Sequence, residues 1–177
     1  KMANKINTFT DFISVSEYFA DEGYQISAVG RSAGGLLMGA VMTMRPELFH
    51  SILAGVPFVD ALNSMVDSRI PLTVPEWKEW GNPNETASFQ HMMEYSPYDN
   101  IRDVIYPNLL ITSSINDPRV QYWEPTKFLA KLRYESSMYD KNVQIMRMRM
   151  NEGHFGGSDL TKTIKERAYE FAFLLTY

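Results

Sequence analysis

Hydrophobic and polar positions define two alternating kinds of segment along the chain. Short runs rich in Val, Ile and Leu, bounded by Gly, Pro, Asn or Asp, are typical of buried β-strands, and they cover Tyr24–Gly30, Ser51–Val56, Asn108–Ser113 and Val143–Met150. Longer segments carry apolar residues at helical spacing, which predicts helices over Thr8–Asp21, Ala33–Met44, Val120–Tyr134 and Asp159–Leu175. Because parallel neighbouring strands need crossover helices, the alternation predicts an α/β fold with a mostly parallel sheet and helices on both faces.

One long segment, Asp60–Asp103, departs from this alternation. It contains four prolines, a polar NPNET stretch and the aromatic residues Trp77, Trp80 and Phe89. We expect an excursion with short helices, of the kind that builds a substrate pocket above a sheet. Because no repeat or linker-like run divides the chain, we expect a single domain over residues 1–177.

Composition then removes several classes of function. The chain has 177 residues, with 17 Lys and Arg against 21 Asp and Glu, and no basic cluster, so we expect no nucleic-acid partner. The absence of Cys excludes a disulfide framework, a thiolate zinc site, an iron–sulfur cluster and a Cys nucleophile. The absence of Cys also favours a cytoplasmic location. The apolar stretches are shorter than the ~18 residues of a membrane span, so we expect no membrane partner.

The first strand runs directly into the sequence Gly30-Arg31-Ser32-Ala33-Gly34-Gly35 and then into a helix. A G-x-S-x-G sequence between a strand and a helix predicts a nucleophile elbow, which presents its Ser at the carboxyl edge of the sheet. We expect Gly30 and Gly34 to stand where a Cβ atom would clash. The alternative interpretation is a Gly-rich turn that packs against a neighbour or binds a phosphate.

A nucleophilic Ser needs a base, and three histidines are available. His154 follows the last predicted strand in a Gly-flanked loop, which places it at the same edge of the sheet as Ser32. His50 precedes a strand and therefore lies at the opposite edge, and His91 lies in the excursion. We expect these two to be surface or packing residues.

The acid that orients the base should also stand just past a strand end. Asp117 meets this condition, and the order Ser32, Asp117, His154 is the chain order of an α/β-hydrolase triad. Asp60, which follows the second predicted strand, is the competing carboxylate.

Several separate motifs resemble the catalytic domain of the prolyl oligopeptidase family, and specifically its oligopeptidase B branch. They are GRSAGGLLMGAVMTMRPELF, VPFVD, EWGNPNE, SPYDNI, NDPRVQYWEPTKFLAKLR and GHFGG. The resemblance extends from Asn7 onward. It implies the C-terminal part of an α/β-hydrolase fold, and in that branch the matching Ser, Asp and His form the catalytic triad.

The resemblance also implies roles that spacing alone does not reveal. Arg119 matches the family's anchor for a substrate backbone carbonyl, and the Ala33 backbone N–H matches one donor of the oxyanion hole. The second donor is a Tyr from an upstream segment that this chain does not contain. Glu76 matches the first of two acidic positions that receive Arg or Lys before the scissile bond. The second position is Lys78 here, and we expect its ammonium group to offset part of the attraction.

Only 31 residues precede Ser32, fewer than the earlier strands of a complete hydrolase sheet need. We therefore expect the C-terminal part of a longer protein, without the N-terminal strands and the β-propeller of the family. A sheet without its first strands would expose an edge and an apolar face, so a partner segment is expected there.

Together these observations predict a serine peptidase that hydrolyses oligopeptides, after basic residues, through an acyl-enzyme and with no metal or cofactor. An esterase or acylaminoacyl-type peptidase on the same fold is one alternative. The other is a non-catalytic fragment that complements a separate N-terminal segment, and an isolated chain of this length is expected to be nearly inactive.

Overall fold

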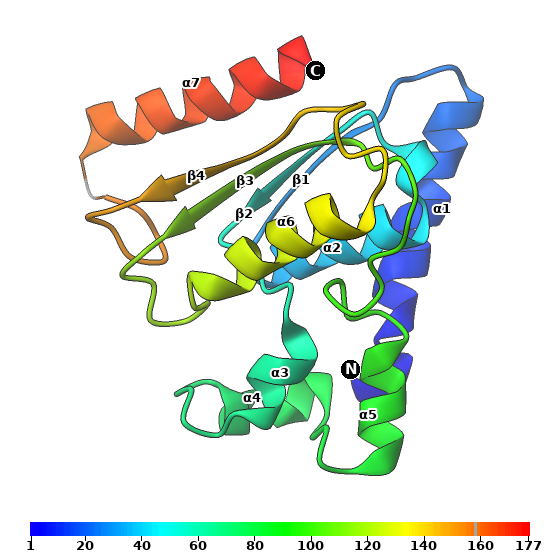
Figure 1. Ribbon diagram of the computed structural model, residues 1–177, viewed down its shortest axis with the longest axis vertical. Helices are drawn as coiled ribbons and strands as arrows, with labels where there is room; N and C mark the ends of the chain where they lie inside the picture. The colour runs from blue at the N-terminus through cyan, green and yellow to red at the C-terminus, as the bar shows by residue number, and fades with distance from the viewer. Residues whose placement is uncertain (158) are drawn as a thin grey trace.

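A parallel sheet organises the computed structural model, which describes residues 1–157 and 159–177. Within these residues the strands run in the order β1-β2-β3-β4, with bounds Ser27–Arg31, Ser51–Gly55, Asn108–Ser114 and Gln144–Arg149. All neighbouring pairs are parallel, and in register Ser27 lies opposite Ser51 and Ser51 opposite Asn108. The predicted α/β fold is confirmed (Figure 1).

Helices cover the two faces of this sheet, as the alternation predicts. The helices α2 (Ala33–Met44) and α6 (Trp123–Glu135) lie along one face, and α7 (Leu160–Thr176) lies along the other (Figure 1). The helix α1 (Ile6–Asp21) packs beside α2. The start of α6 is three residues later than predicted, because the Asp117 side chain accepts hydrogen bonds from the backbone N–H groups of Arg119 and Val120 and holds this segment as a loop.

The two faces of the sheet differ in how many apolar side chains they bury. Ile52 and Ala54 of β2 belong to a large core with residues of α1, α2 and α6, whereas Leu53 points to the other face, where Leu110 and Phe173 complete a small cluster. On that side Phe171 of α7 is 61% exposed, and Val29 on the edge strand β1 is 49% exposed. Apolar side chains thus remain in solvent there, and coverage by a further segment stays a prediction.

The excursion between β2 and β3 forms a smaller lobe below the sheet in Figure 1. It consists mainly of three short helices, α3 (Ala61–Val66), α4 (Thr73–Trp80) and α5 (Thr86–Met93), as the Pro-rich pattern predicts. The indole N–H of Trp77 donates to the Met65 carbonyl at 3.0 Å, and Trp80 packs on Phe58 at 5.5 Å between ring centroids. These aromatic contacts fix α4 against α3 and the end of β2.

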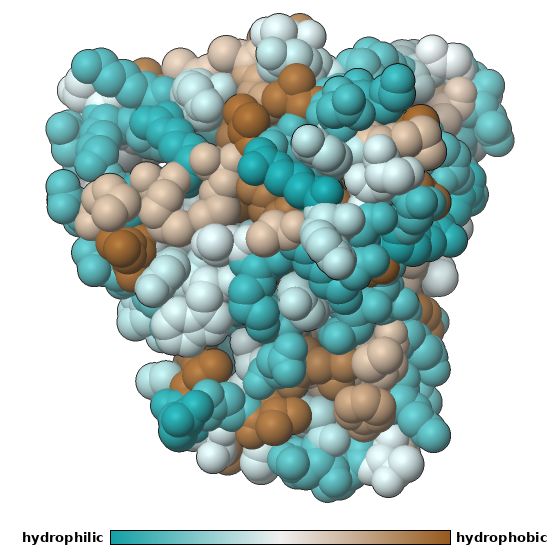
Figure 2. All heavy atoms as spheres, viewed as in Figure 1, coloured by the Kyte–Doolittle hydropathy of each residue, from teal (hydrophilic) through white to brown (hydrophobic). Residues whose placement is uncertain are grey.

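Two short 3₁₀ turns, Met2–Asn4 and Pro46–Leu48, complete the described structure. In the view of Figure 2, hydrophobic residues appear in separate small areas between hydrophilic ones. In the described part of the chain, each helix is too short or too polar to cross a membrane.

Candidate active site

The turn between β1 and α2 holds Ser32 in a strained conformation. Its φ of 56° and ψ of −118° lie in a region that non-Gly residues rarely occupy. The Ser32 N–H donates to the Gly55 carbonyl at 2.9 Å, and the Ser32 carbonyl accepts from Gly35 and Leu36 in the first turn of α2. Hydrogen bonds to β2 and α2 therefore hold Ser32 in this strained conformation. Its hydroxyl lies at the carboxyl edge of the sheet.

The glycines around this turn serve different purposes. A Cβ atom at Gly30 would lie 2.0 Å from the Gly34 carbonyl oxygen, and one at Gly35 would lie 2.5 Å from Pro57. A Cβ atom at Gly34 would meet nothing within 4 Å. The expectation that Gly34 is sterically required is therefore wrong, because the close approach occurs at Gly30 and Gly35.

The three strand-end residues lie within hydrogen-bond distance of one another. Ser32 Oγ is 3.0 Å from His154 Nε2, and His154 Nδ1 is 2.8 Å from Asp117 Oδ2. The other carboxylate oxygen of Asp117 accepts backbone N–H groups from Arg119 at 2.8 Å and Val120 at 3.0 Å. Asp117 and His154 are both buried. This arrangement can polarise a hydroxyl for attack on a carbonyl carbon.

The competing residues lie elsewhere. His50 stands immediately before β2, at the amino edge of the sheet, and His91 is on α5, 3.6 Å from Glu94. Asp60 is buried, but its carboxylate accepts from Lys127 at 2.6 Å and from Asn63 at 2.7 Å. Of the carboxylates considered from the sequence, the structure brings Asp117 and not Asp60 to His154.

A cavity of about 330 Å³ opens beside Ser32. Its walls come from the β1–α2 turn, the end of β2, the excursion, the loop after β3 and the start of α6, and they include Ser32, Ala33, Phe58, Met65, Leu72, Glu76, Glu79, Trp80, Arg119, Val120 and Glu124. Ala33 is the first residue of α2, where backbone N–H groups have no partner inside the helix. The guanidinium of Arg119, which also lines the cavity, lies 5.0 Å from the Phe155 ring centroid.

One predicted feature of this cavity is wrong. Glu76 does line it and accepts the Trp80 indole N–H at 2.7 Å, but Lys78 is exposed and lines a separate surface depression with Trp77 and Asn82. The reason is helical geometry, because residues three and four positions after Glu76 share its face of α4, whereas the residue two positions on does not. The Lys78 ammonium group is therefore not beside Glu76.

Glu79, three residues after Glu76, shares its face of α4 and also lines the cavity. Sequence reasoning missed this residue. Glu79 accepts from Lys5 at 2.9 Å, and this hydrogen bond lowers the pKa of Glu79. Lys5 also lies 4.5 Å from the Trp80 ring centroid. The i, i+3 spacing from Glu76 is a signal that could have identified Glu79. No local pattern connects Lys5, which precedes α1, to this cavity.

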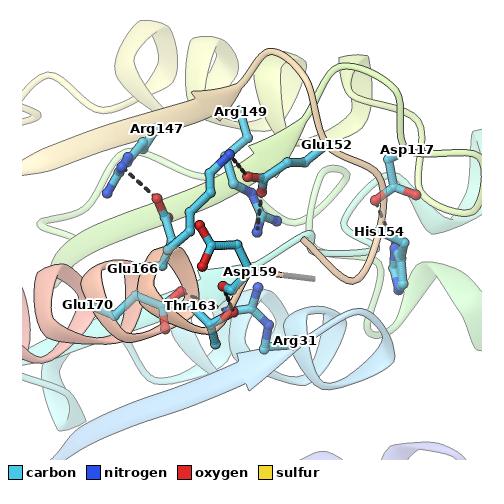
Figure 3. A network of polar contacts seen from close by, with 11 residues as sticks. Arg31, Asp117, Arg147, Arg149, Glu152, His154, Asp159, Thr163, Glu166 and Glu170 are labelled. Atoms are coloured by element: carbon cyan, nitrogen blue, oxygen red, sulfur yellow. Dashed lines mark hydrogen bonds and ion pairs between the residues drawn. The ribbon is translucent and has the colours of Figure 1, made fainter. Parts of the chain in front are cut away.

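Behind the His154 loop lies a network of ion pairs that links β4, β1 and α7 (Figure 3). Glu152, two residues before His154, is 5% exposed in its side chain and pairs with Arg149 at 3.4 Å and with Lys162 of α7. Arg31, next to Ser32, pairs with Glu170 at 2.8 Å. Burial, followed by the positive charge of Arg31, lowers the pKa of Arg149. The turn of Ser32 and the loop of His154 are therefore both connected to α7.

Among the described residues, no group of three or more His, Asp or Glu side chains is arranged to hold a metal ion. The profile of the family described as "Prolyl oligopeptidase family" matches residues 1–177. The chain belongs to the prolyl oligopeptidase family.

Relatives in this family include Protease 2 of Moraxella lacunata, 48% identical, and Dipeptidyl aminopeptidase BI of Pseudoxanthomonas mexicana, 47% identical, each aligned with 99% of this chain. Among solved structures, oligopeptidase B from Leishmania major matches with 46% identity and a TM-score of 0.96. Oligopeptidase B from Trypanosoma brucei with covalently bound antipain, in a closed form, matches with 49% identity and a TM-score of 0.95. Both structural alignments cover 99% of this chain and 25% of the other chain.

The chain therefore spans about a quarter of the length of these relatives, namely 26% of Protease 2 and 24% of Dipeptidyl aminopeptidase BI. The resemblance inferred from the sequence motifs is confirmed at the level of the family.

Proposed function

We propose that this chain supplies the catalytic residues of a serine peptidase. The observation that carries the proposal is the continuous line of hydrogen-bonding groups from Ser32 Oγ through the His154 ring to the buried Asp117 carboxylate, at 3.0 and 2.8 Å. His154 takes the proton as the Ser32 oxygen attacks a peptide carbonyl, and Asp117 holds the ring in the required tautomer and balances its positive charge. The two backbone N–H groups on Asp117 fix the orientation of its carboxylate.

The later steps follow from the same geometry. The Ala33 backbone N–H stabilises negative charge on the carbonyl oxygen of the tetrahedral intermediate. His154 then returns the proton to the departing amine, which leaves an acyl group on Ser32. Water, deprotonated by His154, attacks this ester and releases the free enzyme. The family resemblance implies that the second oxyanion donor is a Tyr from an upstream segment outside this chain.

We further propose that the substrate carries Arg or Lys before the scissile bond. The cavity beside Ser32 combines apolar walls, from Phe58, Met65 and Trp80, with the carboxylates Glu76 and Glu79. Apolar walls suit the methylene stem of a basic residue, and carboxylates form charge-assisted hydrogen bonds with its head group. Arg119, at the opening of the cavity, donates to a substrate backbone carbonyl.

The chain acts within a longer polypeptide in this proposal, because the relatives are about four times as long. The exposed side chains of Val29 and Phe171 mark where further parts of the sheet or another domain would pack. A propeller domain that limits access to oligopeptides is part of the same proposal.

Labelling with a fluorophosphonate tests the activated Ser directly. The whole protein that contains this chain should be labelled at Ser32, and the Ser32→Ala and His154→Ala variants should not be. Lack of labelling in the folded wild-type protein would support the non-catalytic alternative. A panel of peptide, ester and N-acylated substrates then separates the peptidase from an esterase or acylaminoacyl-type enzyme.

A second candidate, removal of dipeptides from a free amino terminus, is favoured by the 47% identity to Dipeptidyl aminopeptidase BI. Both activities use the same acyl-transfer residues, so the difference lies in what recognises the substrate amino terminus. Paired peptides with free and acetylated amino termini decide between them. Equal cleavage of both indicates an endopeptidase, and cleavage of the free form alone indicates dipeptide release.

A further inference from the structure

The cavity beside Ser32 contains a third carboxyl group, which the mechanism above does not use. Glu124, in the first turn of α6, is 1% exposed, yet it lines the same cavity as Glu76 and Glu79. Ser64 donates its hydroxyl to one oxygen of Glu124 at 2.7 Å, and the Asp60 backbone N–H donates to the other at 3.2 Å. These contacts fix the carboxyl in the cavity wall.

Glu124, unlike Asp60 and Glu79, has no cation of its own. Lys127, one turn further along α6, donates to Asp60 at 2.6 Å, and Lys5, which lines the cavity, donates to Glu79 at 2.9 Å. Among the ion pairs of the described residues, none involves Glu124. A buried carboxyl group that borders a substrate cavity and lacks a cation is a site where a positive group of the ligand can bind.

We propose that Glu124 is a specificity-determining residue that receives the positively charged side chain of the substrate, opposite Glu76. The proposal rests on the function proposed above and assigns this residue to the same cavity. It predicts that the preference for Arg over an uncharged residue of the same shape depends on Glu124 as well as on Glu76.

Burial gives this interaction a distinct pH dependence. Burial, assisted by the negative charge of Asp60, raises the pKa of Glu124 from 4.5 to about 8, although the hydrogen bonds from Ser64 and Asp60 act in the opposite direction. The other charged groups that face the cavity are Glu76, Glu79, Lys5 and Arg119, and Lys127 lies behind Asp60. At pH 7 the empty cavity therefore holds Glu124 mostly protonated. A bound guanidinium stabilises the charged form of Glu124 over the protonated form, so binding of the substrate releases the Glu124 proton to solvent.

The decisive measurement is the ratio of kcat/KM for paired peptides with Arg or citrulline before the scissile bond, from pH 6.5 to 9. Citrulline has the shape of Arg without its charge, and the titration of His154 affects both peptides equally and cancels in the ratio. In the wild-type protein the ratio should rise as the pH passes through about 8. In Glu124→Gln it should be about tenfold lower at pH 9 and independent of pH.

Asp60→Asn is the matched control. Asp60 is an equally buried carboxylate next to Glu124, but its side chain faces Lys127 and does not line the cavity. This variant should keep the preference for Arg. The ratio of kcat/KM for Arg over citrulline should rise at a lower pH than in the wild-type protein, because the Asp60 charge contributes to the raised pKa of Glu124. A wild-type preference for Arg that is unchanged in Glu124→Gln would overturn the inference and leave the proposed function intact. Absence of that preference in the wild-type protein would overturn both this inference and the proposed preference for basic residues.

Calorimetry provides a test that does not need the Glu124 variant to fold. The Ser32→Ala protein, which keeps the cavity, is titrated at pH 7 with the Arg peptide in buffers of different ionisation enthalpy. We expect release of close to one proton per Arg peptide bound and none with the citrulline peptide. Equal proton release with both peptides, or none with either, would contradict the proposed role of Glu124.

Discussion

The proposed triad and the cavity beside it meet at Ser32 but are built from different parts of the molecule. Ser32, Asp117 and His154 each follow a parallel strand, and three hydrogen-bonded strand pairs set the positions of those strand ends. The carboxyl groups of the cavity come from α4 in the excursion and from the first turn of α6. Parallel strands bring their carboxyl ends to one edge in any sheet of this topology, whereas an excursion has no such general rule.

In the proposed function, this difference separates the residues of the chemical step from those of substrate specificity. Residues on strand ends are held by the sheet, so their substitution should affect the rate with every substrate. Residues on the excursion and on α6 line the cavity that is proposed to hold the substrate side chain, so their substitution should change the ratio between substrates. The predictions below test this division in the whole protein that contains the chain.

The largest effect is expected at the nucleophile. Ser32→Ala should lower kcat by about 10⁶-fold, His154→Ala should have a similar effect, and the double variant should be no worse than either, because the two residues act as a unit. The measurement is kcat with Arg and Phe substrates, and both should fall by the same factor. Undiminished turnover in Ser32→Ala would exclude the proposed triad.

A smaller loss is expected where the ion-pair network holds the loop of His154. Glu152→Gln removes the charge that pairs with Arg149 and Lys162, and a shift of the loop by ~1 Å costs up to about 10²-fold in rate. We expect kcat to fall between tenfold and a hundredfold, with KM changed little. Glu166→Gln, which removes the ion pair with Arg147 elsewhere on α7, is the control and should keep most of the activity. Equal losses in both variants would indicate general destabilisation of α7.

The difference between strand-end residues and cavity residues also explains how much of the site could be predicted from the sequence alone. All four strands and the positions of Ser32, Asp117 and His154 at one edge were predictable, because hydrophobic runs mark strands and parallel topology aligns their ends. The cavity was only partly predictable. Lys78 and Glu79 are adjacent in sequence but lie on different faces of α4, and Glu124 is held in the cavity wall by a hydrogen bond from Ser64 of α3. Such contacts depend on tertiary structure, which no local pattern encodes.

Substitutions of Glu76 and Lys78 test which residues of α4 contact the substrate side chain. The expected change in the preference for Arg is about tenfold. Glu76→Gln should lower the ratio of kcat/KM for Arg over Phe substrates by about tenfold, because it removes one charge-assisted interaction with the guanidinium. Lys78→Glu should leave that ratio nearly unchanged, since Lys78 is exposed and lies outside the cavity. A clear strengthening of the Arg preference in Lys78→Glu would instead support the expectation from sequence, with Lys78 beside the bound substrate.

The last prediction concerns stability rather than turnover. Because the folded protein raises the pKa of Glu124 from 4.5 to about 8, the unfolded chain binds fewer protons at this residue between these two values. The contribution of Glu124 to the free energy of unfolding therefore becomes less favourable as the pH rises from about 4.5 to about 8, and it is constant above that range. Glu124→Gln has no proton to lose, so its stability should fall less than that of the wild-type protein between pH 6 and 9.

Urea unfolding midpoints at several pH values measure the difference, and Glu76→Gln, at another carboxyl group of the cavity, is the control. Parallel pH profiles for the wild-type and Glu124→Gln proteins would mean that Glu124 ionises in the folded protein as easily as in water, and its role as a proton-releasing group of the cavity would then be wrong.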